Sequence, residues 1–115
     1  MRFAIGPHNE VIVGGNYEKP AEANNNLAFT KNGGKTWAIA KGLNGYRSGV
    51  AYLDKNTIIA VGSNGSNISF DGGENWREED KENYNAVQSI GKNSTWGVGP
   101  RGMVARFINV KVVLD

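Results

Sequence analysis

The sequence predicts an all-β protein built from many short antiparallel strands. Glycine makes up 16 of the 115 residues, which favours tight turns over long helices. Apolar residues come in short bursts separated by Gly, Asn and Asp, as expected for strands joined by turns. No window of about ten residues has the helical period of about 3.6. A polar, glycine-centred motif also occurs twice, with starting points 39 residues apart.

The apolar bursts define the expected strands in chain order. Each one ends at a turn signal: the first stops at Gly6-Pro7, the second at Gly14-Gly15, and the sixth at Gly62-Ser63. In order, the bursts cover residues 3–5, 11–13, 27–29, 37–39, 50–53, 58–61, 68–70, 76, 86–90, 96–98, 103–107 and 110–114.

The bursts repeat in phase, which predicts three similar units. Val13-Gly14, Val61-Gly62 and Val98-Gly99 each close an apolar burst that follows a polar turn. We therefore expect three four-stranded units over about residues 1–41, 42–80 and 81–115. The first unit carries an insertion of about ten residues at 16–26, and long insertions often map to a functional or variable surface.

The repeated motif reads Ser/Thr, any residue, Asp/Asn, Gly, Gly, two polar residues, Trp. Its copies are 30–37 and 69–76. A period of about 40 residues is typical of a β-propeller blade, and closed propellers have about four to eight blades. Three units therefore predict an incomplete propeller.

The residue types of the motif suit a self-contained hairpin turn. Gly-Gly accepts positive φ, and the preceding Asn or Asp can accept backbone hydrogen bonds within the turn. Each tryptophan is expected to pack beneath its turn and to bury on the order of 200 Å². The structural set comprises Thr30, Asn32, Gly34, Thr36, Trp37, Ser69, Asp71, Gly73 and Trp76.

The motif resembles the Asp-box, or bacterial neuraminidase repeat (BNR), Ser/Thr-x-Asp-x-Gly-x-Thr-Trp. The first copy departs from it at Asn32 and the second at Asn75. The wider context is similar to the C-terminal blades of bacterial proteins related to the photosystem II stability/assembly factor, which are often labelled oxidoreductase-like. The segments that carry this resemblance are 13–20, 45–52, 60–66 and 96–102. It covers about residues 3–108, and it implies a β-propeller but no particular reaction.

Catalysis is not the leading expectation, although the enzyme question stays open. Sialidases carry Asp-boxes at the blade periphery, away from their catalytic centre, so Asp71 is better explained as part of a turn. Glycoside hydrolysis of that kind needs an arginine cluster, a Tyr/Glu nucleophile pair and an acid/base Asp. No such set is evident around the five arginines, which are Arg2, Arg47, Arg77, Arg101 and Arg106.

Composition argues against several other classes of function. The net charge is +2 without a basic run, so we expect no nucleic-acid partner. Cysteine is absent, and the single histidine, His8, lies in a turn-like segment, so no metal or other cofactor is expected. The acidic run 78–82 is interpreted as a solvated loop, with a weak calcium site as the alternative. No membrane span or signal peptide is apparent in the sequence. The cellular compartment stays open, with export of full-length relatives to the periplasm or the cell surface as one alternative.

The most informative candidates for binding lie on loops opposite the repeat turns. In a propeller these loops and the inter-blade links share one face, where aromatic and arginine side chains favour recognition. The alternative is that Arg47 and Arg101 satisfy backbone carbonyls while the tyrosines fill space. The candidate binding residues are Tyr17, Glu18, Tyr46, Arg47, Asn64, Tyr84 and Arg101, with Lys19, Ser63 and Asn85 beside them.

The leading hypothesis is a non-catalytic scaffold or interaction module that binds a protein or a small ligand. Its open flanks should expose apolar sheet faces, which predicts either self-association or additional blades in a longer protein. The alternative is part of a sialidase-like carbohydrate-active enzyme whose catalytic residues lie on other blades.

Overall fold

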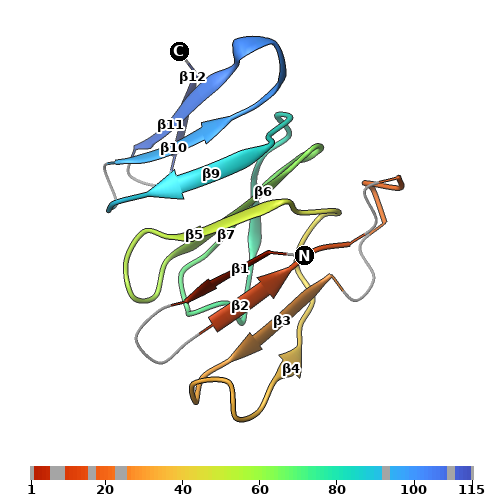
Figure 1. Cartoon of the computed structure of the whole chain (residues 1–115), viewed down its shortest axis with the longest axis vertical. Coiled ribbons are helices and arrows are strands. Elements are labelled where there is room, and N and C mark those ends of the chain that lie inside the picture. Colours follow the sequence, from red (N-terminus) through yellow and green to blue (C-terminus); the bar gives the residue numbers. More distant parts are fainter. Residues whose placement is uncertain are drawn as a thin grey trace.

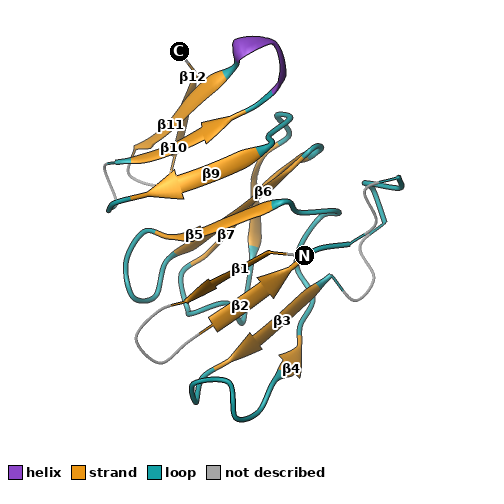
Figure 2. Cartoon of the chain, in the orientation of Figure 1, coloured by secondary structure: helices purple, strands orange, loops and turns teal. Residues whose placement is uncertain are grey.

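The computed structural model describes residues 2–5, 10–15, 18–22, 26–91, 94–108 and 111–114. They form three four-stranded antiparallel sheets that do not close on one another, so the predicted all-β, partial-propeller fold is confirmed (Figure 2). Each sheet uses four strands that are consecutive in the sequence.

The first sheet has the order β1-β2-β3-β4, the second β5-β6-β7-β8, and the third β12-β11-β10-β9. A short 3₁₀ turn at Pro100–Gly102 joins β10 to β11. The strands are β1 (Arg2–Ile5), β2 (Glu10–Val13), β3 (Leu27–Thr30), β4 (Ala38–Ile39), β5 (Gly49–Tyr52), β6 (Ile58–Gly62), β7 (Gly65–Ser69), β8 (Arg77–Asp80), β9 (Ala86–Ser89), β10 (Thr95–Val98), β11 (Val104–Ile108) and β12 (Lys111–Leu114).

The second sheet lies between the other two and is buried on both faces. On β6, Ile58 and Ala60 belong to the core shared with the first sheet, whereas Ile59 and Val61 belong to the core shared with the third. A strand covered on both faces reads as a continuous apolar run, which explains the uninterrupted apolar segment 58–61.

The first and third sheets each have one covered and one open face. On β2, Val11 and Val13 are fully buried against the second sheet, while Ile12 lies on the opposite, open face of the first sheet. On β10, Gly97 is buried whereas Trp96 and Val98 are exposed. Strand β5 contacts both β1 and β9, so the first strands of the three sheets are neighbours (Figure 1).

Candidate partner-binding face

The two repeat turns connect the third and fourth strands of their sheets, and each is organised by its own polar side chains. In the first turn, the Gly34 amide donates to Thr30 Oγ1 at 3.1 Å and the Thr36 amide donates to Asn32 Oδ1 at 3.0 Å. In the second, the Gly73 amide donates to Ser69 Oγ at 2.9 Å and the Asn75 amide donates to Asp71 Oδ1 at 2.9 Å. The hydrogen bonds to Asn32 and Asp71 are of the kind that the motif predicts.

Asp71 is held as a carboxylate by the second turn. Burial raises its pKa, but hydrogen bonds from the backbone and side chain of Asn75, from Ser69 and from the Glu74 amide outweigh that effect, so the pKa lies below its ordinary value. All of these donors belong to the turn itself. The contacts of Asp71 therefore account for it as an acceptor within a hairpin.

The first tryptophan is less buried than the second, although its ring lies beside Gly34 of its own turn. Trp76 is partly buried, packs against the core between the first two sheets, and donates from Nε1 to the Gly73 carbonyl at 2.8 Å. Trp37 is 41% exposed. Its open environment arises because the described chain has no sheet beyond the first one to cover it.

The loops at the opposite ends of the strands lie along one side of the molecule, which we call the loop face (Figure 1). It consists of segments 18–22, 40–48, 63–64, 81–85 and 99–103. The segment after β2 is tied to the link between sheets, since the Tyr46 amide and Asn64 Nδ2 both donate to the Pro20 carbonyl at 2.9 and 3.0 Å. The sequence-predicted residues Tyr46 and Asn64 are thus brought together with the insertion.

Gly45 makes this close approach possible. Its φ is +151°, and a Cβ at this position would overlap the Pro20 carbonyl oxygen and crowd the Asn64 amide nitrogen. The Asn26 side chain donates to the Gly45 carbonyl at 2.8 Å from the other end of the insertion. The loop face is therefore held at this point by hydrogen bonds to the backbone carbonyls of Pro20 and Gly45.

Arg47 lies beneath the loop face and offers no exposed surface. Its side chain is fully buried, and its guanidinium donates to the Tyr46 carbonyl at 2.9 Å, Asn64 Oδ1 at 2.6 Å and Asn67 Oδ1 at 2.6 Å. Burial lowers the Arg47 pKa to about 10, against the opposing influence of Glu78 and Asp80. This arrangement matches in part the alternative in which Arg47 satisfies backbone carbonyls, since one acceptor is the Tyr46 carbonyl and the other two are side-chain amide oxygens.

Tyr84 is also buried, at 1% exposure. Its ring packs on Phe107 with a centroid separation of 5.8 Å, and its hydroxyl donates to Asp80 Oδ2 at 3.0 Å. Burial, followed by the charge of Asp80, raises the Tyr84 pKa well above its ordinary value. The residue fills the core between the second and third sheets and does not contribute a contact surface.

Arg101 is the exposed arginine of the loop face, and it has an unusual backbone. Its φ of +62° makes it a non-glycine residue in the left-handed region, which costs roughly 1–2 kcal/mol. It borders a hollow of about 300 Å³ that is also lined by Glu82, Asn83, Pro100 and Met103. Sequence reasoning missed Glu82, Asn83 and Met103, although Glu82 and Asn83 directly precede the predicted Tyr84.

The remaining predicted residues are distributed around this face. Tyr17 lies outside the described residues, while Glu18 and Lys19 are exposed in the insertion. Ser63 and Asn85 are exposed, and the Asn85 carbonyl accepts a hydrogen bond from Ser48 Oγ at 3.1 Å. Most of the available side chains therefore come from the insertion and from the neighbourhood of Arg101.

The acidic run is not a solvated loop throughout, as residues 77–80 form strand β8. Asp80 accepts hydrogen bonds from Ser66 Oγ at 2.6 Å and from the Tyr84 hydroxyl. Within the described part of the chain, no group of three His, Cys, Asp or Glu side chains is placed to hold a metal ion. No helix among the described residues has the length and apolar character required to cross a membrane.

Comparison with solved structures identifies a similar fold. The structure of YCF48 bound to a D1 peptide superposes with a TM-score of 0.74 at 17% sequence identity, and the match covers 98% of this chain and 38% of the YCF48 chain. No protein-family model matches the chain, and no curated protein does. At this identity the likeness concerns the fold, and there it confirms the predicted resemblance to the photosystem II assembly factor group.

Proposed function

We propose that this chain is a non-catalytic propeller scaffold that binds a protein segment across its loop face. The observation that carries the proposal is the pairing of an exposed, conformationally constrained Arg101 with a hollow of about 300 Å³. The hollow has both a cationic and an anionic wall, Arg101 and Glu82, which suits a peptide with polar or charged groups more than a purely apolar ligand.

The rigidity of the loop face supports this proposal. The Arg47 guanidinium joins the link at Tyr46 to Asn64 and Asn67 in the second sheet. A buried, well-bonded cation is strongly destabilised when its partners are removed, so it holds these loops in one arrangement. A surface that is ordered before binding loses less entropy when a partner docks.

The fold relationship supports a peptide as the class of partner. The structure of YCF48, whose fold is similar to that of this chain, contains a bound D1 peptide. The chain spans 38% of the length of the YCF48 chain that it matches, and we propose that it functions within a larger propeller assembly of the BNR, or Asp-box, type. The blades that complete the assembly are considered below.

Fluorescence anisotropy with a labelled D1 peptide tests the proposal directly. We expect saturable binding that Arg101→Gly weakens by roughly tenfold, because a charge-assisted hydrogen bond contributes about 1.5–3 kcal/mol. Glycine is the appropriate replacement because it removes the side chain and tolerates the positive φ. Lys55→Ala is the matched control, since Lys55 is an exposed cation in the turn between β5 and β6.

Binding that is equal for wild type, Arg101→Gly and Lys55→Ala would contradict a role for Arg101. Turnover of a fluorogenic sialoside by an intact protein that carries further blades would instead favour the sialidase-like alternative. Arg47→Ala is unsuitable for this experiment because it would remove a buried side chain on which the loop arrangement depends.

A further inference from the structure

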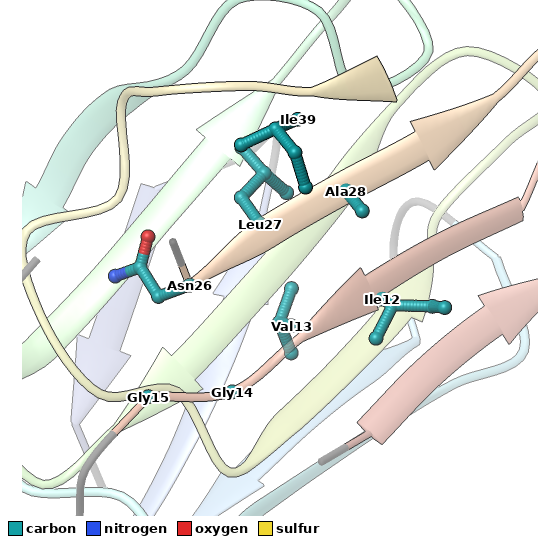
Figure 3. Close-up of a pocket in the computed structure, with 8 residues that line it drawn as sticks. All are labelled: Ile12, Val13, Gly14, Gly15, Asn26, Leu27, Ala28 and Ile39. Atoms are coloured by element: carbon teal, nitrogen blue, oxygen red, sulfur yellow. The ribbon is translucent and has the colours of Figure 1, made fainter. Parts of the chain in front are cut away.

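The open faces of the first and third sheets carry complementary groups. The first has a hollow of about 170 Å³ lined by Ile12, Ala28 and Ile39, among others (Figure 3). The third presents Trp96 and Val98, which are 41% and 44% exposed. Exposed apolar faces of this kind are typical of surfaces that pack against another sheet.

The contact between the first and second sheets shows how one blade covers the next. The second repeat turn packs over β2 and β3, since a Cβ at Gly73 would lie 3.0 Å from Val11 Cγ2 and 3.7 Å from Phe29 Cβ. The same position would lie 3.6 Å from Ile58 Cδ1 of its own sheet. Gly73 and Ile58 of one blade therefore meet Val11 and Phe29 of the preceding blade.

The strand registers identify the equivalent residues on the two open faces. Glu10 pairs with Thr30, which begins the first turn, as Ile58 pairs with Ser69, which begins the second. Glu10 and Gly34 are thus the counterparts of Ile58 and Gly73. A Cβ at Gly34 would lie 3.7 Å from Glu10 Oε2, so these two groups adjoin as their counterparts do.

The third sheet carries the counterparts of Val11 and Phe29. The repeat aligns Val98 with Val13 and hence Trp96 with Val11, and Trp96 pairs with Arg106 as Val11 pairs with Phe29. If another blade covered each open face in the same way, Glu10 and Gly34 would face Trp96 and Arg106.

The charges on these faces are complementary. The Arg106 guanidinium stacks over the Trp96 ring, 5.5 Å from its centroid, and its buried Nε has no hydrogen-bond partner among the described residues. No ion pair within the described ranges involves Glu10 or Arg106. The first sheet therefore presents a carboxylate where the third presents a partly desolvated cation.

We infer that the open faces are covered by a second copy of this chain, with Glu10 of each copy paired to Arg106 of the other. The inference rests on the proposed function in one respect, because the second copy supplies further blades to the proposed scaffold. Two copies provide six sheets, within the range of about four to eight found in closed propellers. Each copy contributes one face of each kind, so a two-fold axis closes the ring with two equal contacts.

Light scattering coupled to size-exclusion chromatography measures the assembly of the wild-type chain. We expect twice the chain mass of 12.4 kDa. Glu10→Arg and Arg106→Glu each place like charges together at both contacts, and we expect each to weaken the dimer by at least roughly 30-fold. Lys55→Glu is the matched charge-reversal control, which should leave the dimer intact.

A mixture of the two variants distinguishes a specific pair from misfolding. When Glu10→Arg chains are mixed with Arg106→Glu chains, the two substituted side chains meet with opposite charges at one contact. The native Glu10 and Arg106 meet at the other contact, so the dimer should return. The double variant should also dimerise with itself. Restoration requires that both single variants are folded.

A wild-type chain that stays at 12.4 kDa, or single variants that dimerise as well as wild type, would overturn the inference. The D1-peptide assay separates this outcome from failure of the proposed function. A monomer that binds the peptide through Arg101 would contradict only the dimer. A dimer that shows no Arg101-dependent binding would contradict only the peptide site.

Discussion

The two repeat turns have the same internal hydrogen bonds and different surroundings. In both turns, a Ser or Thr hydroxyl accepts a hydrogen bond from the amide of the second glycine. The Asn or Asp side chain accepts one from the amide of the residue before the tryptophan. Yet Trp76 packs into the core between two sheets, whereas Trp37, directly before β4, is 41% exposed. Local residue types are therefore sufficient for the turn, but burial of its tryptophan requires a neighbouring sheet.

The largest difference is expected on truncation of the tryptophans. Trp76→Ala should lower the free energy of unfolding by about 3 kcal/mol, because it leaves a cavity between sheets and removes the hydrogen bond to Gly73. Trp37→Ala should cost about 1 kcal/mol in a monomer. Urea denaturation of both variants measures the difference, and equal losses would contradict the contrast in burial.

The glycine pairs should show a smaller difference in the same direction. In Gly34→Ala and Gly73→Ala the backbone holds the new alanine at a positive φ, which lowers the free energy of unfolding by about 1–2 kcal/mol. A Cβ at Gly73 would also press on Val11 at 3.0 Å, which should add about 1 kcal/mol or more, whereas Gly34 has no contact closer than 3.7 Å. Thermal unfolding of the two variants should therefore give the lower melting temperature for Gly73→Ala.

The stability contributed by the second turn should fall in acid, whereas that of the first turn should not, because the first turn has Asn32 in place of the aspartate. Because hydrogen bonds hold the Asp71 pKa below its ordinary value of 3.8, its stabilising effect is complete above that pH and is lost as the pH falls through the lower folded-state pKa. Asp71→Asn should reduce the loss of stability between about pH 5 and about pH 2. Asn32→Asp should increase it, if the first turn holds a carboxylate equally well.

The smallest effect is expected where the two turns touch. Lys31 Nζ lies 2.7 Å from Glu74 Oε2, with both side chains about half exposed. An exposed pair of this kind contributes roughly 0.2–1 kcal/mol and is weakened by salt. A double-mutant cycle with Lys31→Ala and Glu74→Ala should give a coupling energy in that range, and a larger value would mean that the turns support each other.

Most of the secondary structure could be predicted from the sequence because it depends on short-range patterns. Alternating burial on β2 follows from the period-two geometry of strands, and the continuous apolar run on β6 is typical of a strand that is covered on both faces. The turn hydrogen bonds also join residues within four positions of one another. The candidate site was predictable only in part: Tyr46 and Asn64 lie beside the inserted segment, whereas Arg47 and Tyr84 are buried.

Burial of Arg47 and Tyr84 was one of two alternatives that the sequence left open, because the partners that decide it are distant in sequence. Arg47 is bonded to Asn67, 20 residues away, and Tyr84 packs on Phe107. A polar pair, Ser66-Asn67, in an inward-facing strand was the available hint, since buried amides need partners.

The sequence by itself determined the strands, the two turns and the antiparallel all-β fold class, since these depend on local backbone preference and periodicity. Tertiary structure alone decided which arginine is buried, which tryptophan is covered and where the hollow beside Arg101 forms. Those properties depend on the stacking of separate sheets, where desolvation and close packing act between residues far apart in the chain.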